Sequence, residues 1–353
     1  MQSFRSYSKL FLPFFIINLC SINYAYSEPN GTAFIYDNMG SNSVVIATCD
    51  KFAGAICRLS FNGKQLVDNF DHGRQIQTAV FYPNSAFNAD GSRMGSEAFA
   101  PTEAGSRVDG QGNNSTSLLQ SIYSNADYLK TKIRPAYWLQ PGESSPAGLG
   151  ATGLNTSLVS NTIVEKEIKI GYSKNGVNIP HAIEINHKIT LEPNLPNNVN
   201  YGNSQNSAGN KMTFEVIAAY LHKDLNKFYS FNEATGKLVL LSGNKHNSYE
   251  GAFVVSNQQG TVWLGLYTPD GSTYNQSNGD WQVNSKGYWH NYGMQYLDAN
   301  TDLSSQRGLV KLNSVMRKMG GANEVHNFRH FLALAGSKQG IETVMSNLYQ
   351  YVN

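Results

Sequence analysis

Short apolar or alternating segments, separated by turn residues, dominate the hydrophobic pattern of this chain. Segments of this kind bounded by Gly, Asn and Ser predict β-strands. The Asn62-Gly63 pair lies between two of them and favours a two-residue hairpin turn. The predicted strands are residues 43–48, 55–61, 76–82, 162–172, 182–191, 212–221, 237–241, 252–255 and 261–267.

A helical pattern is clear at the C-terminus, where Ile341, Val344, Met345 and Leu348 form one apolar stripe after a capping residue, Ser337. Many strands without intervening helices predict an all-β fold, a large antiparallel β-sandwich, with this short C-terminal helix. We expect the helix to seal an open end of the sandwich.

Two long polar stretches, residues 140–161 and 193–211, are predicted to be loops inserted in one domain rather than linkers. No composition change divides the chain, and a single β-domain reaches this length. The domain prediction is therefore one β-sandwich over residues 28–353.

The N-terminus has the pattern of a secretory signal peptide, predicted over residues 1–27. Arg5 and Lys9 precede an apolar run, 10–22, which is followed by small residues near Ser27. The run is shorter than the roughly 20 apolar residues that a membrane span needs. We expect a secreted or periplasmic mature protein without a membrane anchor.

Charge argues against a nucleic-acid partner. The chain has 27 basic and 25 acidic residues, a net charge of +2, and the signal peptide contains two of the basic residues and no acidic ones. The mature chain would therefore be neutral, and its Lys and Arg residues occur singly rather than in runs. A polyphosphate partner requires an excess of positive charge gathered on one face.

Cys49 and Cys57 flank a short segment, and in an exported protein they are predicted to form a disulfide. A redox or metal-binding pair is the alternative. No further ligands occur nearby at a zinc-like spacing, so no metal or cofactor is expected.

Ionisable residues are sparse, at 15% of the chain, yet they are concentrated in Asp71-His72-Gly73-Arg74 and in the segment containing Glu103 and Arg107. His72 and Arg74 share a face of an extended segment. An arginine beside an imidazole can hold a carboxylate or hydroxyl and move a proton. The alternative is a structural ion pair of Arg74 with Asp71 or Glu103.

Glu103 and Arg107 lie in a loop rich in small residues, which suits a loop over a cleft. If Glu103 and His72 converge, they form an acid/base pair. His187 alternates with isoleucines and so faces an apolar side, as either a core residue or a third proton-transfer candidate. Glu184, Asn186 and Lys188 would face water.

Aromatic and amide side chains complete the predicted binding residues. Aromatic rings can stack on the apolar face of a ligand while polar groups reach its hydroxyl groups. Besides Arg74 and Arg107, the predicted substrate-binding residues are Gln77, Trp138, Trp289, His290 and Tyr292. Alternation predicts that His290 and Tyr292 share a face opposite Trp289. The alternative for each aromatic residue is a place in the core.

Five segments follow one another in a characteristic order: Asn62-Gly63-Lys64, Asp71 to Gln77, Ala219-Tyr220-Leu221, Leu225 to Tyr229 and Gly265 to Asp270. This order resembles that of galactose-mutarotase-like β-supersandwich proteins. The resemblance implies a sugar on a concave sheet face. Mutarotases themselves use a histidine and a glutamate around the sugar, and their histidine and C-terminal glutamate signatures are absent here.

The sequence therefore predicts an exported carbohydrate-active protein that acts on a glycan by acid/base chemistry, as a lyase, epimerase or hydrolase. His72, Glu103 and His187 are the predicted proton-transfer residues, and lyase or epimerase chemistry fits a single evident carboxylate better than hydrolysis does. The alternative is a non-catalytic secreted protein that binds glycans or a host surface. No protein partner is indicated.

Overall fold

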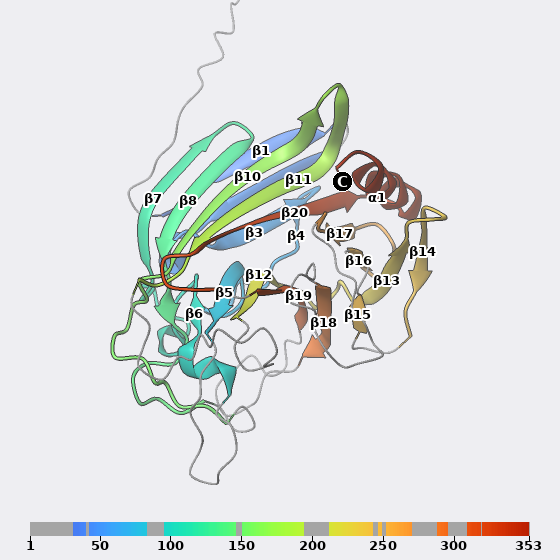
Figure 1. Cartoon of the computed structure of the whole chain (residues 1–353). Helices are drawn as coiled ribbons and strands as arrows, with labels where there is room; N and C mark the ends of the chain where they lie inside the picture. Colours follow the sequence, from blue (N-terminus) through green and yellow to red (C-terminus); the bar gives the residue numbers. More distant parts are fainter. Residues whose placement is uncertain are drawn as a thin grey trace, which may run out of the picture.

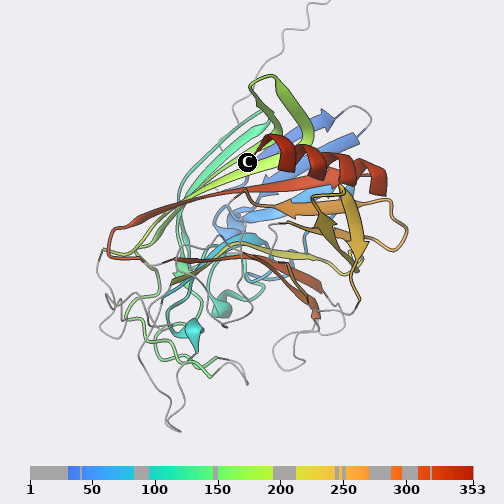
Figure 2. The same cartoon turned by 45° about the vertical axis from the view of Figure 1, so that its right-hand side comes forward.

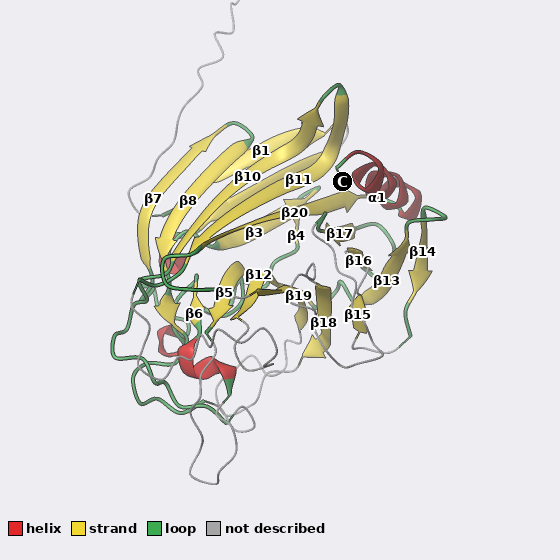
Figure 3. Ribbon diagram, in the orientation of Figure 1, coloured by secondary structure: helices red, strands yellow, loops and turns green. Residues whose placement is uncertain are grey.

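Two antiparallel β-sheets and one C-terminal helix form the structure, a computed structural model (Figures 1 and 3). It describes residues 31–39, 42–82, 95–145, 150–193, 212–242, 246–248, 252–269, 288–295, 309–318 and 320–352. The predicted signal peptide and all but the first residue of the predicted loop at 193–211 lie outside these residues. The predicted all-β sandwich class is confirmed.

The first sheet has 11 strands and the order β1-β2-β3-β5-β12-β19-β18-β15, with β4 on β3, β6 on β5 and β9 on β6. The strands are β1 (Phe34–Met39), β2 (Asn42–Thr48), β3 (Ile56–Phe61), β4 (Lys64–Gln65), β5 (Ile76–Phe81), β6 (Pro101–Thr102), β9 (Ala136–Tyr137), β12 (Met212–His222), β15 (His246–Ser248), β18 (Tyr288–Gln295) and β19 (Leu309–Lys318).

The second sheet has nine strands in the order β14-β13-β16-β17-β20-β11-β10-β8-β7. The strands are β7 (Leu118–Asn125), β8 (Tyr128–Arg134), β10 (Ile163–Lys174), β11 (Val177–Thr190), β13 (Lys227–Asn232), β14 (Lys237–Leu240), β16 (Ala252–Ser256), β17 (Trp263–Tyr267) and β20 (Val325–Ala335). Three short 3-10 turns, η1 (Asp50–Phe52), η2 (Ser96–Phe99) and η3 (Arg107–Asp109), lie in the connections.

Alternation places the core between the sheets. Side chains at every second position of the long strands are buried in two apolar clusters, which both sheets contribute to. Asn62 and Gly63 both have positive φ, at 51° and 77°, as the predicted hairpin turn between β3 and β4 requires. All nine predicted strands are present, and the predicted hairpin includes β4. The predicted ranges do not include β1, β7, β8, β13, β18, β19 and β20, nor the short strands β6, β9 and β15.

The C-terminal helix α1 (Lys338–Tyr351) begins as predicted, because the Ser337 hydroxyl accepts a hydrogen bond from Gly340 N at 3.1 Å. Its apolar stripe packs on the outer face of the second sheet (Figure 2). A Cβ on Gly265 would lie 2.6 Å from Met345 Sδ, so glycine permits this close approach. The helix covers a sheet face rather than sealing an end, which corrects that expectation.

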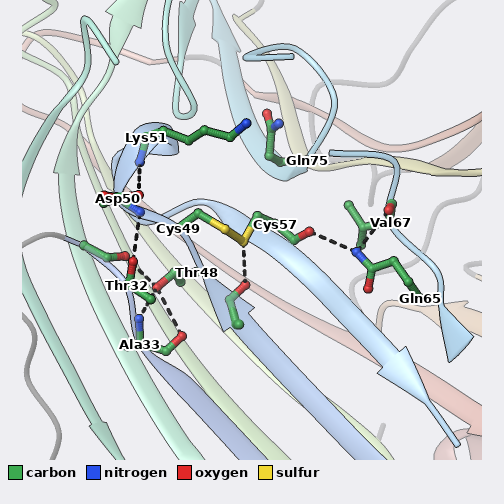
Figure 4. Close-up of a disulfide and its surroundings, with 12 residues drawn as sticks. Thr32, Ala33, Thr48, Cys49, Asp50, Lys51, Cys57, Gln65, Val67 and Gln75 are labelled. Atoms are coloured by element: carbon green, nitrogen blue, oxygen red, sulfur yellow. Dashed lines mark hydrogen bonds between the residues drawn. A yellow bond between two sulfur atoms is a disulfide. The ribbon is translucent and has the colours of Figure 1, made fainter. Parts of the chain in front are cut away.

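A disulfide joins Cys49 and Cys57, with the two Cα atoms 5.9 Å apart, as predicted (Figure 4). It closes the loop that contains η1, directly before β3. Gln65 Nε2 donates hydrogen bonds to the Cys57 and Val67 carbonyl groups, each at 3.1 Å, so the strand after the disulfide is held to the next segment. The disulfide and these hydrogen bonds together hold in place the connection that leads to the Asp71 segment.

Candidate functional site

The Asp71–Arg74 segment forms a tight turn around Gly73. Gly73 N donates to Asp71 Oδ1 at 3.0 Å, and Gln77 Nε2 donates to the Gly73 carbonyl at 3.1 Å. A Cβ on Gly73 would lie 3.2 Å from the ring of Trp138, which packs over the turn. Two predicted site residues, Gln77 and Trp138, thus meet at Gly73, next to Arg74 in the chain.

Arg74 is buried and engaged by the acids of its own turn. Its Nε lies 3.2 Å from Asp71 Oδ2, and its Nη1 lies 3.8 Å from Asp68 Oδ2. Burial raises the pKa of Asp71, and the Arg74 guanidinium opposes that rise. Because two carboxylates already face the guanidinium, this arginine has little positive charge to offer a ligand.

Arg107 and Gln77 are also engaged within the protein. Arg107 Nε donates to Glu143 Oε1 at 2.8 Å. Gln77 Oε1 accepts a hydrogen bond from Ala104 N at 3.0 Å. These side chains fix the loops at this end of the first sheet, and their predicted substrate contacts stay predictions.

His72 is 1% exposed, and both of its ring nitrogens lie against carbonyl oxygens. Nδ1 is 2.8 Å from the Gly110 oxygen, and Nε2 is 2.5 Å from the Lys51 oxygen. The ring also packs edge-on against Phe52, with centroids 5.1 Å apart. His72 therefore ties the disulfide loop to the η3 segment, and no described contact joins its ring to Glu103.

Glu103 points between the two sheets instead. Its carboxylate forms an ion pair with Lys166 of β10 and accepts a hydrogen bond from Thr78 N at 2.9 Å. His187 of β11 is the cross-strand partner of Lys166, and its ring lies 5.7 Å from that of His330. Two predicted catalytic residues, Glu103 and His187, are thus brought together around a buried lysine.

We define the inner polar layer as Glu103, Lys166, His187, His330 and Ser314. Each is at most 3% exposed. His330 Nε2 and Ser314 Oγ are 2.7 Å apart, which links the second sheet to the first. The residues of this layer that lie in strands occupy the same inward-facing positions as the buried residues of the two apolar clusters of the core. The layer therefore lies between those two clusters.

Burial controls the protonation of the histidines in this layer. It lowers the pKa of His330 to about 3 and that of His187 well below the ordinary value, with a further lowering from His330 and from the Lys166 ammonium group. Both rings are therefore neutral at physiological pH.

The opposite face of the first sheet carries a different set of polar groups. Cross-strand rows in β5, β12 and β19 alternate between the core and this outer face. The row of Ile76, Ala219 and Leu312 lies in the core. The neighbouring row, Gln77, Ala218 and Asn313, consequently faces outward. Lys311 lies two residues before Asn313 and shares this face. Glu215 lies beyond a register shift in β12, next to the core residue Phe214, and also faces outward.

Glu97 of η2 lies close enough to this face to interact with Glu215 and Lys311. Burial raises the pKa of Glu97, the Glu215 carboxylate raises it further, and the Lys311 ammonium group lowers it. We define the outer-face site as Gln77, Glu97, Glu215, Lys311 and Asn313. Lys311 also lies over the ring of Tyr220, 5.1 Å from its centroid.

Asn313 is the most unusual member of this site. It is 0% exposed, and among the described residues neither its Nδ2 nor its Oδ1 has a hydrogen-bond partner. A buried amide without partners costs about 1–3 kcal/mol, so native proteins retain few of them. A group that completes this position would have to accept a hydrogen bond from Nδ2 and donate one to Oδ1.

The remaining predicted residues, Trp289, His290 and Tyr292, belong to β18, for which the structure describes the backbone. His290 is the register partner of Asn313, so its Cα lies in the same cross-strand row as Gln77 and Ala218. The register shifts between Asn291 and Gly293. Strict alternation, the basis for placing His290 and Tyr292 together, therefore breaks at Tyr292.

The sequence pattern missed Glu97, Glu215 and Asn313. Glu215 carried a usable signal, because it is a single carboxylate inside an apolar strand. Asn313 lies in a strand that the pattern did not predict.

Among the described residues, no group of three or more His, Cys, Asp or Glu could hold a metal ion. Also within that part of the chain, no helix is long and apolar enough to cross a membrane.

No protein-family model and no curated protein matches the sequence. Solved structures similar to the chain include a putative aldose 1-epimerase from Escherichia coli K12, with 7% identity and a TM-score of 0.42 over 86% of this chain and 99% of that one. Heparan sulfate lyase HepC from Pedobacter heparinus has 8% identity and a TM-score of 0.40 over 88% of this chain and 37% of the lyase.

A third similar structure is a galactose mutarotase-like protein from Lactobacillus casei ATCC 334, with 8% identity and a TM-score of 0.39 over 86% of this chain and 99% of that one. Galactose-mutarotase-like folds, which the sequence resembles, are thus found among the similar structures. This chain spans 37% of the length of the lyase.

Proposed function

We propose that the outer-face site binds a neutral sugar and acts on its anomeric centre by acid/base chemistry. The observation that carries the proposal is the buried, unpartnered carboxamide of Asn313 on the same face as two interacting carboxylates, Glu97 and Glu215. A ligand that fills this face must both donate and accept hydrogen bonds.

Sugar hydroxyl groups meet that requirement, because each can donate one hydrogen bond and accept others. A hydroxyl pair could bind Nδ2 and Oδ1 of Asn313 and so remove the cost of burying the amide. Carboxylate oxygens of Glu215 would accept from further hydroxyl groups. Few convergent polar groups on a largely buried surface are typical of small-molecule sites.

The two carboxylates suit opposite roles in proton transfer. Glu97 retains its proton to a higher pH than an ordinary glutamate, so it can donate to a glycosidic or ring oxygen. Glu215 can accept the proton that a water molecule or the anomeric hydroxyl group loses. One proton enters the substrate and one leaves it, as hydrolysis and anomer exchange both require.

A neutral sugar fits better than an acidic one. Elimination from a uronate needs a cation to neutralise the sugar carboxylate. Arg74 and Arg107, the two arginines predicted for that purpose, are engaged by Asp71 and Glu143 respectively. We therefore favour hydrolysis or anomer exchange over lyase chemistry.

We further propose that the protein is exported. The predicted signal peptide supports this location, and so does the Cys49–Cys57 disulfide, because disulfides persist in oxidising compartments.

The test uses residues 28–353 and a panel of glucose, galactose, mannose and their disaccharides. Thermal shift would report binding, and proton NMR would report new products or faster anomer exchange. Glu215→Gln should keep the fold and lose turnover, whereas Glu233→Gln, the same change at an exposed turn, should retain it. Binding without conversion by the wild type would establish the alternative, a non-catalytic glycan-binding protein.

A further inference from the structure

Strand β8 carries three cations on one face. Its sequence alternates, so Leu129, Thr131 and Ile133 are buried while the residues between them face outward. These outward residues include Lys130, Lys132 and Arg134. Alternate residues of a strand are about 6.6 Å apart, so the cations form a row of regular spacing.

The neighbouring strands extend this row into a basic face. Outward positions of β8, β10, β11 and β20 lie in register with one another. The basic residues on this face are Lys130, Lys132, Arg134, Lys169, Lys188 and Arg329, and the acidic ones are Glu165, Glu167 and Glu184. Six cations and three carboxylates leave an excess of three positive charges, although the mature chain as a whole is neutral.

An open groove of about 550 Å³ runs over the middle of this face. Asn186 and Asn327 line it between the charged side chains and could bind hydroxyl groups. The groove is lined by residues of β8, β10, β11 and β20, and none of these lining residues belongs to the cluster that packs against α1. Figure 1 shows that these strands extend beyond α1.

Part of the positive charge on this face is available to a ligand. Lys130 pairs with Glu167 at 2.7 Å, and Lys188 pairs with Glu165 at 3.3 Å. Lys132 has no carboxylate within ion-pair distance among the described residues, and the same is true of Lys169. Exposed ion pairs contribute little, about 0–1 kcal/mol, so an incoming anion can compete for the paired lysines as well.

We propose that this basic face binds an acidic polysaccharide, with the β8 cations contacting its carboxylate or sulfate groups. The glutamates between the cations discriminate between polyanions. Duplex nucleic acid carries one charge per about 1.7 Å, which would place phosphates against Glu165 and Glu167. A polysaccharide with widely spaced charges can contact the cations and avoid the carboxylates.

This surface lies on the sheet opposite the outer-face site, so the inference stands independently of the proposed function. Lys and Arg occur only singly along the sequence, whereas the folded sheet gathers several of them on one face. Strand alternation gathers residues that are separated along the chain onto one face, so the excess of charge emerges only in the folded sheet.

The test measures binding of polygalacturonate to residues 28–353 at low ionic strength by isothermal titration calorimetry. Lys132→Glu should weaken binding at least tenfold, and Lys132→Gln should weaken it less. Added salt should weaken binding of the wild type more steeply than that of either variant. The matched control is Lys223→Glu, the same change at an exposed turn between β12 and β13, which should alter binding less than twofold. Glu215→Gln should leave this binding unchanged.

Three results would overturn the proposal. The first is no saturable binding of polygalacturonate by the wild type. The second is an equal loss in Lys132→Glu and Lys223→Glu, because that would reflect net charge rather than this face. The third is equally tight binding of duplex DNA or of vesicles containing phosphatidylserine, because that would remove the preference for a polysaccharide.

Discussion

The inner polar layer lies between the two sheets and the outer-face site lies on the other side of the first sheet, and their polar groups differ in how many partners they have. In the inner layer, Glu103 forms an ion pair with Lys166, and His330 lies 2.7 Å from Ser314, although His187 Nδ1 has no hydrogen-bond partner among the described residues. In the outer-face site, Asn313 is equally buried, and neither polar atom of its side chain has a hydrogen-bond partner in that part of the chain. A carboxamide with both atoms unpartnered is a position that a ligand can complete.

The largest effect should come from breaking the buried ion pair. Lys166→Met leaves the Glu103 carboxylate unpaired in the core and should lower the free energy of unfolding by about 3–5 kcal/mol. Lys130→Met, which removes an exposed pair with Glu167, should cost less than about 1 kcal/mol. Urea unfolding measures both. Equal losses would show that the inner pair has no special role.

The next effect concerns turnover at the outer-face site. Glu215→Gln should lower kcat/KM for the converted sugar at least about 100-fold, or about 2.7 kcal/mol, since a proton acceptor is lost. Glu97→Gln should lower it similarly. Wild-type activity should fall as the pH rises through the raised pKa of Glu97, because its proton is then lost. Steady-state kinetics measured across pH test this prediction. If activity did not fall at high pH, another group would be the proton donor.

Acid should destabilise the protein through the inner layer. The unfolded chain binds protons at histidine below about pH 6.5, whereas folded His330 has a pKa of about 3, so stability is full above about pH 6.5 and falls below it. At pH 5 the loss from His330 is about 2 kcal/mol. His330→Gln, which can still bond to Ser314, should reduce the slope of stability against pH. An unchanged slope in urea titrations would contradict the burial of a neutral ring.

The substitution with the smallest expected effect, at Asn313, should change the stability of the protein and its affinity for a sugar in opposite senses. Asn313→Leu removes a buried amide without partners and should stabilise the free protein by about 1 kcal/mol. It should also weaken sugar binding about tenfold, or about 1.4 kcal/mol, because the amide no longer contacts hydroxyl groups. Thermal unfolding and a binding titration on the same sample would separate this result from a purely structural role, in which stability falls and affinity stays.

Much of the fold could be predicted from the sequence, because alternation is a local property. The strands around Ile168 and Ile185 carry it clearly. The same alternation predicted that His187 faces an apolar side and that Glu184, Asn186 and Lys188 face water, as observed.

The candidate site was less predictable, because partners come from distant strands. Glu103 stood out in a loop of small residues, but its ion pair with Lys166 depends on how the two sheets meet. Arg74 resembled a free binding group, although Asp68 and Asp71 engage it in the same turn. Asn313 could not be recognised, since only the fold shows that its carboxamide is buried without a partner.

The most direct test follows the Asn313 carboxamide itself. Its side-chain NMR signals, assigned by their loss in Asn313→Leu, would be recorded while a sugar from the panel is titrated into protein labelled at asparagine. We expect a saturable shift of these signals, with the ring signals of His187 and His330 unchanged. Saturable sugar binding that leaves the Asn313 signals in place, or no binding by any sugar of the panel, would contradict the assignment of the outer-face site.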